Sequence, residues 1–457
     1  MIVCKFGGTS VQDAEAMTRL AEIIKARRDR KPVVVASAMG KTTNKLLDAA
    51  VMASQGERQK AVDAIRALED SHLAEARKLG IAVDKDWVYD TVQDYFKKLR
   101  DLVKGLSALG ELTPRITDAV ASYGERLSTA ILTEVLRRHG MQAELMDARE
   151  CIITDDNFIR ATPIFELTNS AIVKYLKPVL DAGKIPVFQG FIGRSQSGIT
   201  TTIGRGGSDY SAAIVGAALD AEDIQIWTDV DGVLTTDPRM VKEARRIRSI
   251  SFEEAAELSY FGAKVLHPST IIPAVKKNIP VRVLNSYRPE NEGTVITETA
   301  SPCDNPVKAI SFKGGITVIN VISTRMLMAY GFLKEIFETF ARYKVPVDVV
   351  STSEVSVSLT VDSSVDIEPI VEDLKKIAEV TVERNKAIVC CVGHNLKNIT
   401  NALYTAMRAM RNVRIQMISQ GASAINITFV IDEERMSEAV QGLHAAFFQT
   451  IDPRVFE

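Results

Sequence analysis

The sequence predicts an α/β domain built on a buried parallel sheet, followed by two copies of a small α+β unit. Residues 2–6 form a short apolar run, an amphipathic helical segment follows, and a second apolar run occupies residues 32–39. Strand, helix and a non-alternating strand in this order are typical of a βαβ unit with a covered sheet. Further on, residues 347–351 align without a gap with residues 415–419, which indicates an internal repeat.

The composition is that of a globular protein with more than one domain. The chain has 457 residues, 46% of them hydrophobic and 25% charged, and this length favours two or three domains. A net charge of -2 gives no general attraction to nucleic acid or to an anionic membrane. The five cysteines are scattered and the five histidines form no HExxH cluster, so neither disulfides nor a zinc site is expected. The sequence shows no leader-like or membrane-spanning apolar stretch, and we expect a cytoplasmic protein.

The first strand ends in a glycine-rich turn that suits an anion. Lys5 lies in the apolar run, and Gly7, Gly8 and a Thr-Ser pair follow before the helix. Glycines let the backbone approach a ligand closely, and the free N–H groups at a helix start suit phosphate. The alternative is an ordinary strand-to-helix turn with a lysine at the strand edge.

Two further segments carry polar side chains towards the same edge of the expected sheet. Residues 37–44, SAMGKTTN, follow the second strand, and ligands of open α/β sheets bind beyond the carboxyl ends of strands. Their hydroxyls are candidates for a polar substrate or for a helix cap. Residues from about 46 to 110 are expected to be helical. Beyond them, Glu125 is either an exposed helix residue or a carboxylate turned towards an ammonium group.

A second glycine-rich loop, GRGGSD at residues 204–209, opens a helix of small residues. It follows an expected strand at 185–192 and a hairpin that returns at 200–203. Asp209 stands where GxGxxG requires its last glycine, and the loop does not match GxxxxGK[ST]. Nicotinamide enzymes and P-loop NTPases are therefore not expected.

A long polar loop follows the expected strand at 224–227, and such a loop is costly to order unless it binds something. Asp229 and Asp231 are either metal-associated or turn residues, and the following glycine favours a turn at Asp231. Lys264 lies among apolar residues, where a lysine either extends its amine to solvent or pairs with a ligand phosphate. Around residues 285–306 a shift to Pro, Glu, Asn, Ser and Thr marks a linker.

These motifs together resemble the aspartate kinases of the amino-acid kinase family, and the resemblance covers nearly the whole chain. In order, the motifs are KFGGTSV at 5–11, SAMGKTTN at 37–44, GE at 124–125, GRGGSD at 204–209, WTDVDG at 227–232, TDPR at 236–239 and FGAKVLHP at 261–268. The terminal repeat is similar to the paired ACT domains of the same family. Its segment TSEVSVSLTVD, at 352–362, resembles the lysine-inhibited forms.

The resemblance implies an amino-acid kinase fold, a three-layer αβα sandwich with a mostly parallel sheet, followed by two ferredoxin-like βαββαβ ACT domains. The implied domains are a catalytic domain at 1–295, a linker at 296–306, a first ACT domain at 307–385 and a second at 386–457. In an alternative assignment, the first strand of residues 307–385 belongs to the second ACT domain.

The implied reaction transfers the γ-phosphoryl group of ATP to the side-chain carboxylate of L-aspartate. It gives 4-phospho-L-aspartate and ADP, the first step towards lysine, threonine and methionine. Mg²⁺ would be held by the ATP phosphates, with no protein side chain as a metal ligand. By this resemblance, Lys5 neutralises the transferring phosphoryl group and Asp209 orients Lys5.

The resemblance also assigns binding residues. For ATP they are Lys5, Gly7, Gly8, Ser10, Thr228, Asp229, Leu234, Arg239 and Lys264, with Leu234 standing where some relatives carry an aromatic residue. For aspartate they are Thr43, Glu125, Arg205 and Ser208.

In the regulatory half, the resemblance implies feedback inhibition by L-lysine bound between ACT units of two subunits, in a homodimer or a dimer of dimers. The matching positions are Met326, Ala329, Gly331, Leu333, Val347, Asp348, Thr352, Ser353 and Glu354. Ala329 stands where some lysine-sensitive enzymes carry serine. The alternatives are another acyl-phosphate-forming amino-acid kinase, for example one acting on glutamate, and a catalytically silent ACT-domain amino-acid sensor.

Overall fold

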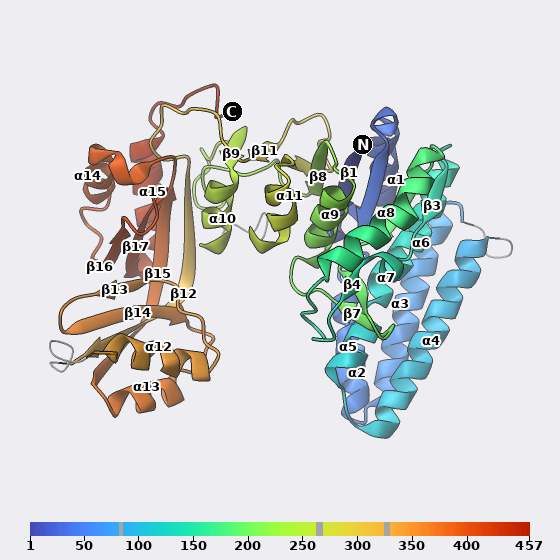
Figure 1. Ribbon diagram of the computed structural model, residues 1–457, viewed down its shortest axis with the longest axis horizontal. Helices are drawn as coiled ribbons and strands as arrows, with labels where there is room; N and C mark the ends of the chain where they lie inside the picture. The colour runs from blue at the N-terminus through green and yellow to red at the C-terminus, as the bar shows by residue number, and fades with distance from the viewer. Residues whose placement is uncertain (82–85, 262–267, 324–329) are drawn as a thin grey trace. The chain divides into compact units, whose positions relative to one another are not determined.

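The chain forms two compact units (Figure 1). The computed structural model describes residues 1–81, 86–261, 268–323 and 330–457. The first unit consists of Met1–Val233 and Val265–Thr299, and the second of Leu234–Lys264 and Ala300–Glu457. The second unit thus takes one segment from within the first predicted domain. Among the described helices, none combines the length and the apolar character needed to cross a bilayer.

The first unit is built on a mostly parallel sheet. Its strands are β1 (Ile2–Phe6), β2 (Pro32–Ala36), β3 (Ala143–Leu145), β5 (Ile185–Gln189), β8 (Asp223–Thr228), β10 (Val281–Asn285) and β11 (Thr294–Thr297). They lie in the order β3-β5-β2-β1-β8-β10-β11, and each neighbouring pair is parallel except β10 with β11. Every residue of β1, β2 and β5 is buried, as expected for strands covered on both faces.

Helices cover both faces of this sheet. They are α1 (Ala14–Lys25), α2 (Thr42–Ser54), α3 (Arg58–Lys78), α4 (Trp87–Leu109), α5 (Pro114–Ala121), α6 (Tyr123–Arg138), α7 (Ala148–Cys151), α8 (Phe165–Asp181), α9 (Gly207–Ala218) and α11 (Ile272–Lys276). The helical segment predicted at about 46–110 consists of α2, α3 and α4, which pack on one another. Cys4 and Phe6 face the core that contains α1, whereas Lys5 faces α9 on the other side. The helix–sheet–helix layering confirms the predicted α/β class.

A small second sheet lies beside the main one in the first unit. It contains β4 (Ile153–Thr154), β6 (Ile192–Ser195) and β7 (Thr200–Thr202). The prediction of one continuous strand over 185–192 is wrong, because β5 ends at Gln189 and β6 begins at Ile192. Phe191 between them has a φ of 71°, which an extended strand cannot accommodate. This break ends the main sheet and starts the β6–β7 hairpin.

The second unit contains a six-stranded sheet with helices packed on it. Its strands are β12 (Ala309–Ile322), β13 (Val350–Thr352), β14 (Ser356–Asp362), β15 (Glu379–Val392), β16 (Ile415–Gln420) and β17 (Asn426–Asp432), in the order β13-β14-β12-β15-β17-β16. Its other elements are β9 (Ser249–Ser251), α10 (Phe252–Tyr260), α12 (Phe332–Arg342), α13 (Glu368–Lys375), α14 (Thr400–Ala409) and α15 (Met436–Phe447). The first repeat contributes α12 and α13 to one end of the sheet, and the second contributes α14 and α15 to the other (Figure 1).

The two repeats share the long strands β12 and β15. Residues 309–313 of β12 pair with 388–392 of β15, and residues 316–322 pair with 379–386. The first part of β12 therefore lies in the half of the sheet that holds the second repeat. The predicted boundary after residue 385 falls within β15, so the two repeats are continuous through one sheet.

Candidate active site

Lys5 lies in β1, next to the glycine turn that ends the strand. The Gly7 N–H donates to the carbonyl oxygen of Trp227 at 3.1 Å and so extends the pairing of β1 with β8. Gly8 opens the short 3₁₀ helix at Gly8–Val11, where the first N–H groups lack a partner within the helix. A Cβ at Gly8 would lie 3.0 Å from the carbonyl oxygen of Gly40, so a side chain here would fit only if the Gly40 backbone shifted by a few tenths of an ångström. Of the two glycines, Gly8 is the one whose N–H suits an anion in this conformation.

The two glycine-rich motifs meet through an ion pair. Lys5 Nζ lies 2.6 Å from Oδ1 of Asp209, which belongs to the first turn of α9. Gly206, at the N-cap of α9, has a φ of 73°, a left-handed conformation that glycine adopts without strain. Lys5 is only 8% exposed. The sequence motifs thus bring a buried cation, its carboxylate partner and a helix N-terminus together beyond the sheet.

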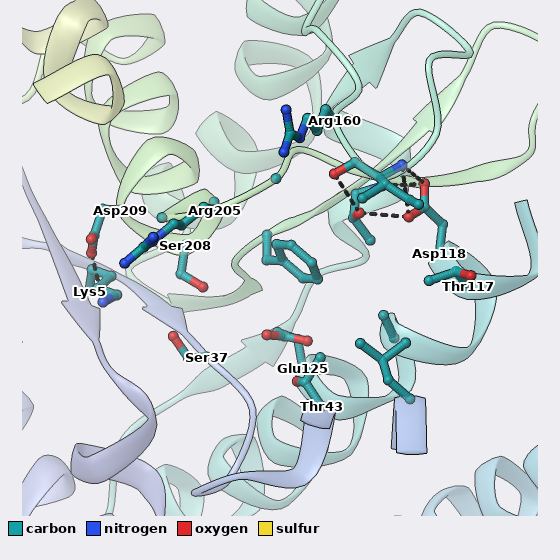
Figure 2. Close-up of a pocket in the computed structure, with 18 residues that line it drawn as sticks. Lys5, Ser37, Thr43, Thr117, Asp118, Glu125, Arg160, Arg205, Ser208 and Asp209 are labelled. Carbon is teal, nitrogen blue, oxygen red and sulfur yellow. Dashed lines mark hydrogen bonds and ion pairs between the residues drawn. The ribbon is translucent and has the colours of Figure 1, made fainter. Parts of the chain in front are cut away.

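A cavity of about 540 Å³ opens beside this ion pair (Figure 2). It contains Lys5, Asp209 and all four residues predicted to bind aspartate. Its lining residues are Lys5, Ser37, Thr43, Leu47, Thr117, Asp118, Ala121, Glu125, Ile159, Arg160, Phe191, Thr202, Gly204, Arg205, Gly206, Gly207, Ser208 and Asp209.

Glu125 of α6 is a buried carboxylate on the cavity wall. It is 4% exposed, and its Oε1 accepts a hydrogen bond from the Ala38 N–H at 3.3 Å. Its Oε2 is buried and has no hydrogen-bond partner. Burial raises the pKa of Glu125 from 4.5 to about 8. The structure thus decides between the two interpretations of Glu125, because an inward carboxylate without a cation suits an ammonium group of a ligand.

The other three predicted substrate contacts surround Glu125 and Lys5. The Arg205 side chain is exposed and extends towards the Lys5 end of the cavity (Figure 2). Ser208 lies against Gly190, where a Cβ would come within 2.6 Å of the serine Cβ. Thr43 Oγ1 would lie 2.8 Å from a Cβ at Gly124. Because Gly190 and Gly124 have no side chain, Ser208 and Thr43 fit beside them.

The cavity also holds residues that the sequence analysis missed, among them Ser37, Asp118, Arg160 and Phe191. Asp118 of α5 is 1% exposed and its carboxylate accepts hydrogen bonds from the Ile159 N–H and from the N–H and hydroxyl of Thr202. Burial raises its pKa, and these hydrogen bonds oppose the shift. Asp118 and Arg160 belong to no motif. Asp118 lies just before the segment that contains Glu125, and Arg160 lies in a polar segment of the chain before the 204–209 loop. These positions were the sequence signal for the two residues.

Replacing Asp118 by alanine should lower the free energy of unfolding by about 2–4 kcal/mol, because three donors from two segments lose a buried acceptor. Denaturant unfolding followed by circular dichroism measures this difference. Asp90→Ala is the control, since Asp90 is an exposed aspartate of α4. A loss no greater for Asp118→Ala than for the control would contradict the assigned role.

The residues predicted to bind ATP fall into separate groups. Thr228 and Asp229 follow the buried part of β8, and the Thr228 hydroxyl donates to Asp229 Oδ1 at 3.1 Å. Ser10 is 2% exposed, and its hydroxyl lies 2.8 Å from that of Ser286. These residues gather at the carboxyl ends of β1, β8 and β10 in the first unit.

Leu234 and Arg239 belong to the second unit. Leu234 forms an isolated bridge with Arg246, and Arg239 is exposed and paired with Asp237 at 2.6 Å. Lys264 lies outside the described residues. Within the part of the chain that the structure describes, no three His, Cys, Asp or Glu side chains come together in a way that could hold a metal ion.

The predicted effector positions centre on Asp348 in the second unit. The Tyr260 hydroxyl donates to Asp348 Oδ1 at 3.0 Å, and Lys313 Nζ lies 3.2 Å from Oδ2. The remaining described positions are Gly331 at the start of α12, Leu333 within it, Val347 before β13, Thr352 at its end, and Ser353 and Glu354 in the turn before β14. Met326 and Ala329 lie outside the described residues.

Comparisons with known proteins show which family the chain resembles. The family model of the amino acid kinase family matches residues 1–285, and a model of the ACT domain matches residues 389–447. Aspartokinase 3, chloroplastic, of Arabidopsis thaliana is 41% identical over 466 residues, which cover 98% of this chain and 82% of the relative. Lysine-sensitive aspartokinase 3 of Escherichia coli is 36% identical over 98% of this chain and 99% of its own length.

Solved structures show the same similarity. The crystal structure of E. coli aspartokinase III in complex with aspartate and ADP, in the R-state, matches 98% of this chain and 100% of its own with a TM-score of 0.84. The structure of the same enzyme with lysine and aspartate, in the T-state, matches with a TM-score of 0.82. Both the family model and the full-length relatives therefore lead to one assignment: the chain belongs to the amino acid kinase family and, within it, to the aspartokinases.

Proposed function

We propose that this protein is an aspartate kinase that transfers the γ-phosphoryl group of ATP to the side-chain carboxylate of L-aspartate. The products are 4-phospho-L-aspartate and ADP. The observation that carries the proposal is the single cavity that joins the Lys5–Asp209 ion pair to Glu125, whose buried oxygen lacks a partner. One end of this cavity suits a phosphoryl group and the other suits an ammonium group.

At the phosphoryl end, catalysis consists of positioning and charge neutralisation. Lys5 is a buried cation that faces the cavity, and Asp209 holds its amine in place. The Gly8 N–H at the start of the 3₁₀ helix adds a donor for a phosphate oxygen. No general base is required, because a carboxylate is already ionised and nucleophilic at neutral pH.

For the amino acid, Glu125 at the other end of the cavity binds the α-ammonium group, and Arg205, which extends towards Lys5, binds a carboxylate through its planar guanidinium. The hydroxyls of Thr43 and Ser208 complete the contacts. A site with these groups rejects acids that lack the ammonium group, because Glu125 would then stay buried without a partner.

ATP is the second substrate, and it would occupy the carboxyl ends of β1 and β8 through Gly7, Gly8, Ser10, Thr228 and Asp229. Mg²⁺ would enter with the nucleotide and be held by its phosphate oxygens, where it supplies charge neutralisation.

L-Lysine is the proposed feedback inhibitor, bound at the ACT units in a homodimer or a dimer of dimers. Asp348 is the proposed contact for the cationic side chain, and in this structure Tyr260 and Lys313 occupy its two oxygens. Burial and the Asp348 carboxylate raise the pKa of Tyr260 to about 12, so its hydroxyl remains a donor at neutral pH. A cationic effector therefore competes with these two groups for Asp348.

Tyr260→Phe should lower the lysine concentration needed for half-inhibition by about 3- to 10-fold, since one competitor for Asp348 is removed. Inhibition curves at fixed ATP and aspartate measure this shift. Tyr343→Phe is a matched control, because the Tyr343 hydroxyl donates to Asp373, which is not a predicted effector residue. Equal curves for the wild type and Tyr260→Phe would count against competition at Asp348.

The proposed reaction is tested by ADP formation in the presence of ATP, Mg²⁺ and L-aspartate, with L-glutamate and L-asparagine as comparison substrates. Aspartate-dependent ADP release that L-lysine suppresses is the expected result. Turnover of glutamate in preference to aspartate would assign another amino-acid kinase. No turnover, in folded protein that still binds lysine, would assign a silent sensor.

A further inference from the structure

The cavity contains two arginines, and only Arg205 has a role so far. Arg160 lines the same cavity, and its side chain is exposed. Within residues 1–81, 86–261, 268–323 and 330–457, neither arginine side chain makes an ion pair or a hydrogen bond. Figure 2 shows Arg160 on the wall that lies beyond Arg205 as seen from Lys5. The cavity therefore offers a second free guanidinium away from the phosphoryl end.

The loop that carries Arg160 is held in place. Ile159 has a φ of 74°, a costly conformation for a β-branched residue, and both carboxylate oxygens of Asp118 accept from its N–H. A Cβ at Gly204 would lie 3.6 Å from Arg160 Cγ, so the arginine stem rests on the glycine loop that also carries Arg205. Arg160 is thus presented from a fixed backbone next to the substrate loop, and such fixing reduces the entropy lost when a ligand binds.

The charges of the cavity leave both arginines available to a ligand. Asp118 is saturated by donors from its own unit, and Asp209 is paired with Lys5. Glu125 is the lining carboxylate that remains, and it has a buried oxygen without a partner. Two guanidinium groups and one carboxylate are complementary to a ligand with two carboxylates and one ammonium group, which is the charge pattern of aspartate.

We propose that Arg160 is a further substrate-binding residue that contacts the α-carboxylate of aspartate. The inference rests on the proposed function, since it takes the side-chain carboxylate to be the one near Lys5. The α-carboxylate then lies on the side away from the phosphoryl end, where Arg160 lies. Arg160 acts on substrate affinity and on recognition of the α-carboxylate, and it takes no part in phosphoryl transfer.

The test combines a change in the enzyme with a change in the substrate. Arg160→Gln should raise the KM for L-aspartate by about 10- to 100-fold, with kcat and the KM for ATP within about threefold of the wild type. L-Aspartic acid α-amide keeps the side-chain carboxylate but lacks the α-carboxylate charge. The α-amide should be a poor substrate for the wild type, and Arg160→Gln should not raise the KM for the α-amide further.

Arg115→Gln is the control, because Arg115 is an exposed arginine of α5 that does not line the cavity. Arg160→Lys should give an intermediate KM, since lysine keeps the charge but not the planar fork. If Arg160→Gln raised the KM for aspartate and the KM for its α-amide by the same factor, the inference would be overturned. A rise in the KM for ATP alone would also overturn it. A wild type without activity on aspartate would instead overturn the proposed function.

Discussion

Lys5→Met should reduce kcat for ATP- and aspartate-dependent ADP formation by about 10²- to 10³-fold, with smaller changes in both KM values. Lys5 is the buried cation nearest to Asp209 and faces the cavity, so its loss removes charge neutralisation where charge develops during transfer. Methionine fills a similar volume and keeps the β1 packing. Steady-state kinetics at saturating ATP and aspartate measure the effect.

Two comparisons separate this effect from a loss of folding. Lys25→Met removes an exposed lysine at the end of α1 and should leave kcat unchanged. Asp209→Asn should also reduce kcat, and the double variant should be no worse than Lys5→Met, because Asp209 acts through Lys5. A Lys5→Met variant with wild-type kcat would exclude Lys5 from the reaction.

Glu125→Gln should abolish most aspartate binding and at the same time stabilise the protein at alkaline pH. The aspartate KM should rise about 100-fold or more, since the ammonium group would lose its buried carboxylate. Glutamine resembles the protonated glutamate in shape and cannot ionise. A site that costs stability in order to bind substrate is expected of a functional cavity.

The pH dependence of this stabilisation has a definite sign. The pKa of Glu125 is raised from 4.5 to about 8 in the folded protein, so between these values the folded state keeps a proton that the unfolded state releases. Stability of the wild type is therefore lost as the pH rises through this interval, by at most about 1.4 kcal/mol per pH unit. Glu125→Gln should match the wild type near pH 4.5 and exceed it increasingly up to pH 8.

Thermal melts of the wild type and Glu125→Gln, recorded from pH 5 to pH 9 without ligand, measure this difference. Aspartate should raise the melting temperature of the wild type only. The variant would contradict the account if it melted at the same temperature as the wild type across the whole range. It would do so equally if it retained tight binding of aspartate.

The ion pair between Lys5 and Asp209 was predicted by the resemblance to the family, and each partner stands beside a glycine-rich motif. Lys5 precedes a glycine turn at the end of a strand, and Asp209 follows a glycine loop at the start of a helix. The meeting of the two motifs followed from the family resemblance, because the hairpin before Asp209 belongs to the small second sheet and the main sheet alone does not place Asp209 beside Lys5. Glu125 was undecided in the sequence, because its helix alone does not show which face is buried; only its packing against Ala38 does.

Other parts of the site depend on contacts between distant segments. Asp118 and Arg160 carry no motif, and the hydrogen bonds to Ile159 and Thr202 that bring them to the cavity join three separate segments. Tyr260 and Asp348 likewise meet only through the tertiary fold. The prediction of a single strand over 185–192 was wrong because an apolar sequence does not reveal the positive φ of Phe191.

The most direct test of the account is the chemical identity of the product. The protein is incubated with ATP, Mg²⁺ and L-aspartate in the presence of hydroxylamine, which traps an acyl phosphate as a hydroxamate, and the trapped compound is identified by mass spectrometry and NMR. The expected product is the hydroxamate of the aspartate side-chain carboxylate, formed in proportion to ADP and not formed by Lys5→Met. ADP release without this hydroxamate, or a hydroxamate of the α-carboxylate, would contradict it.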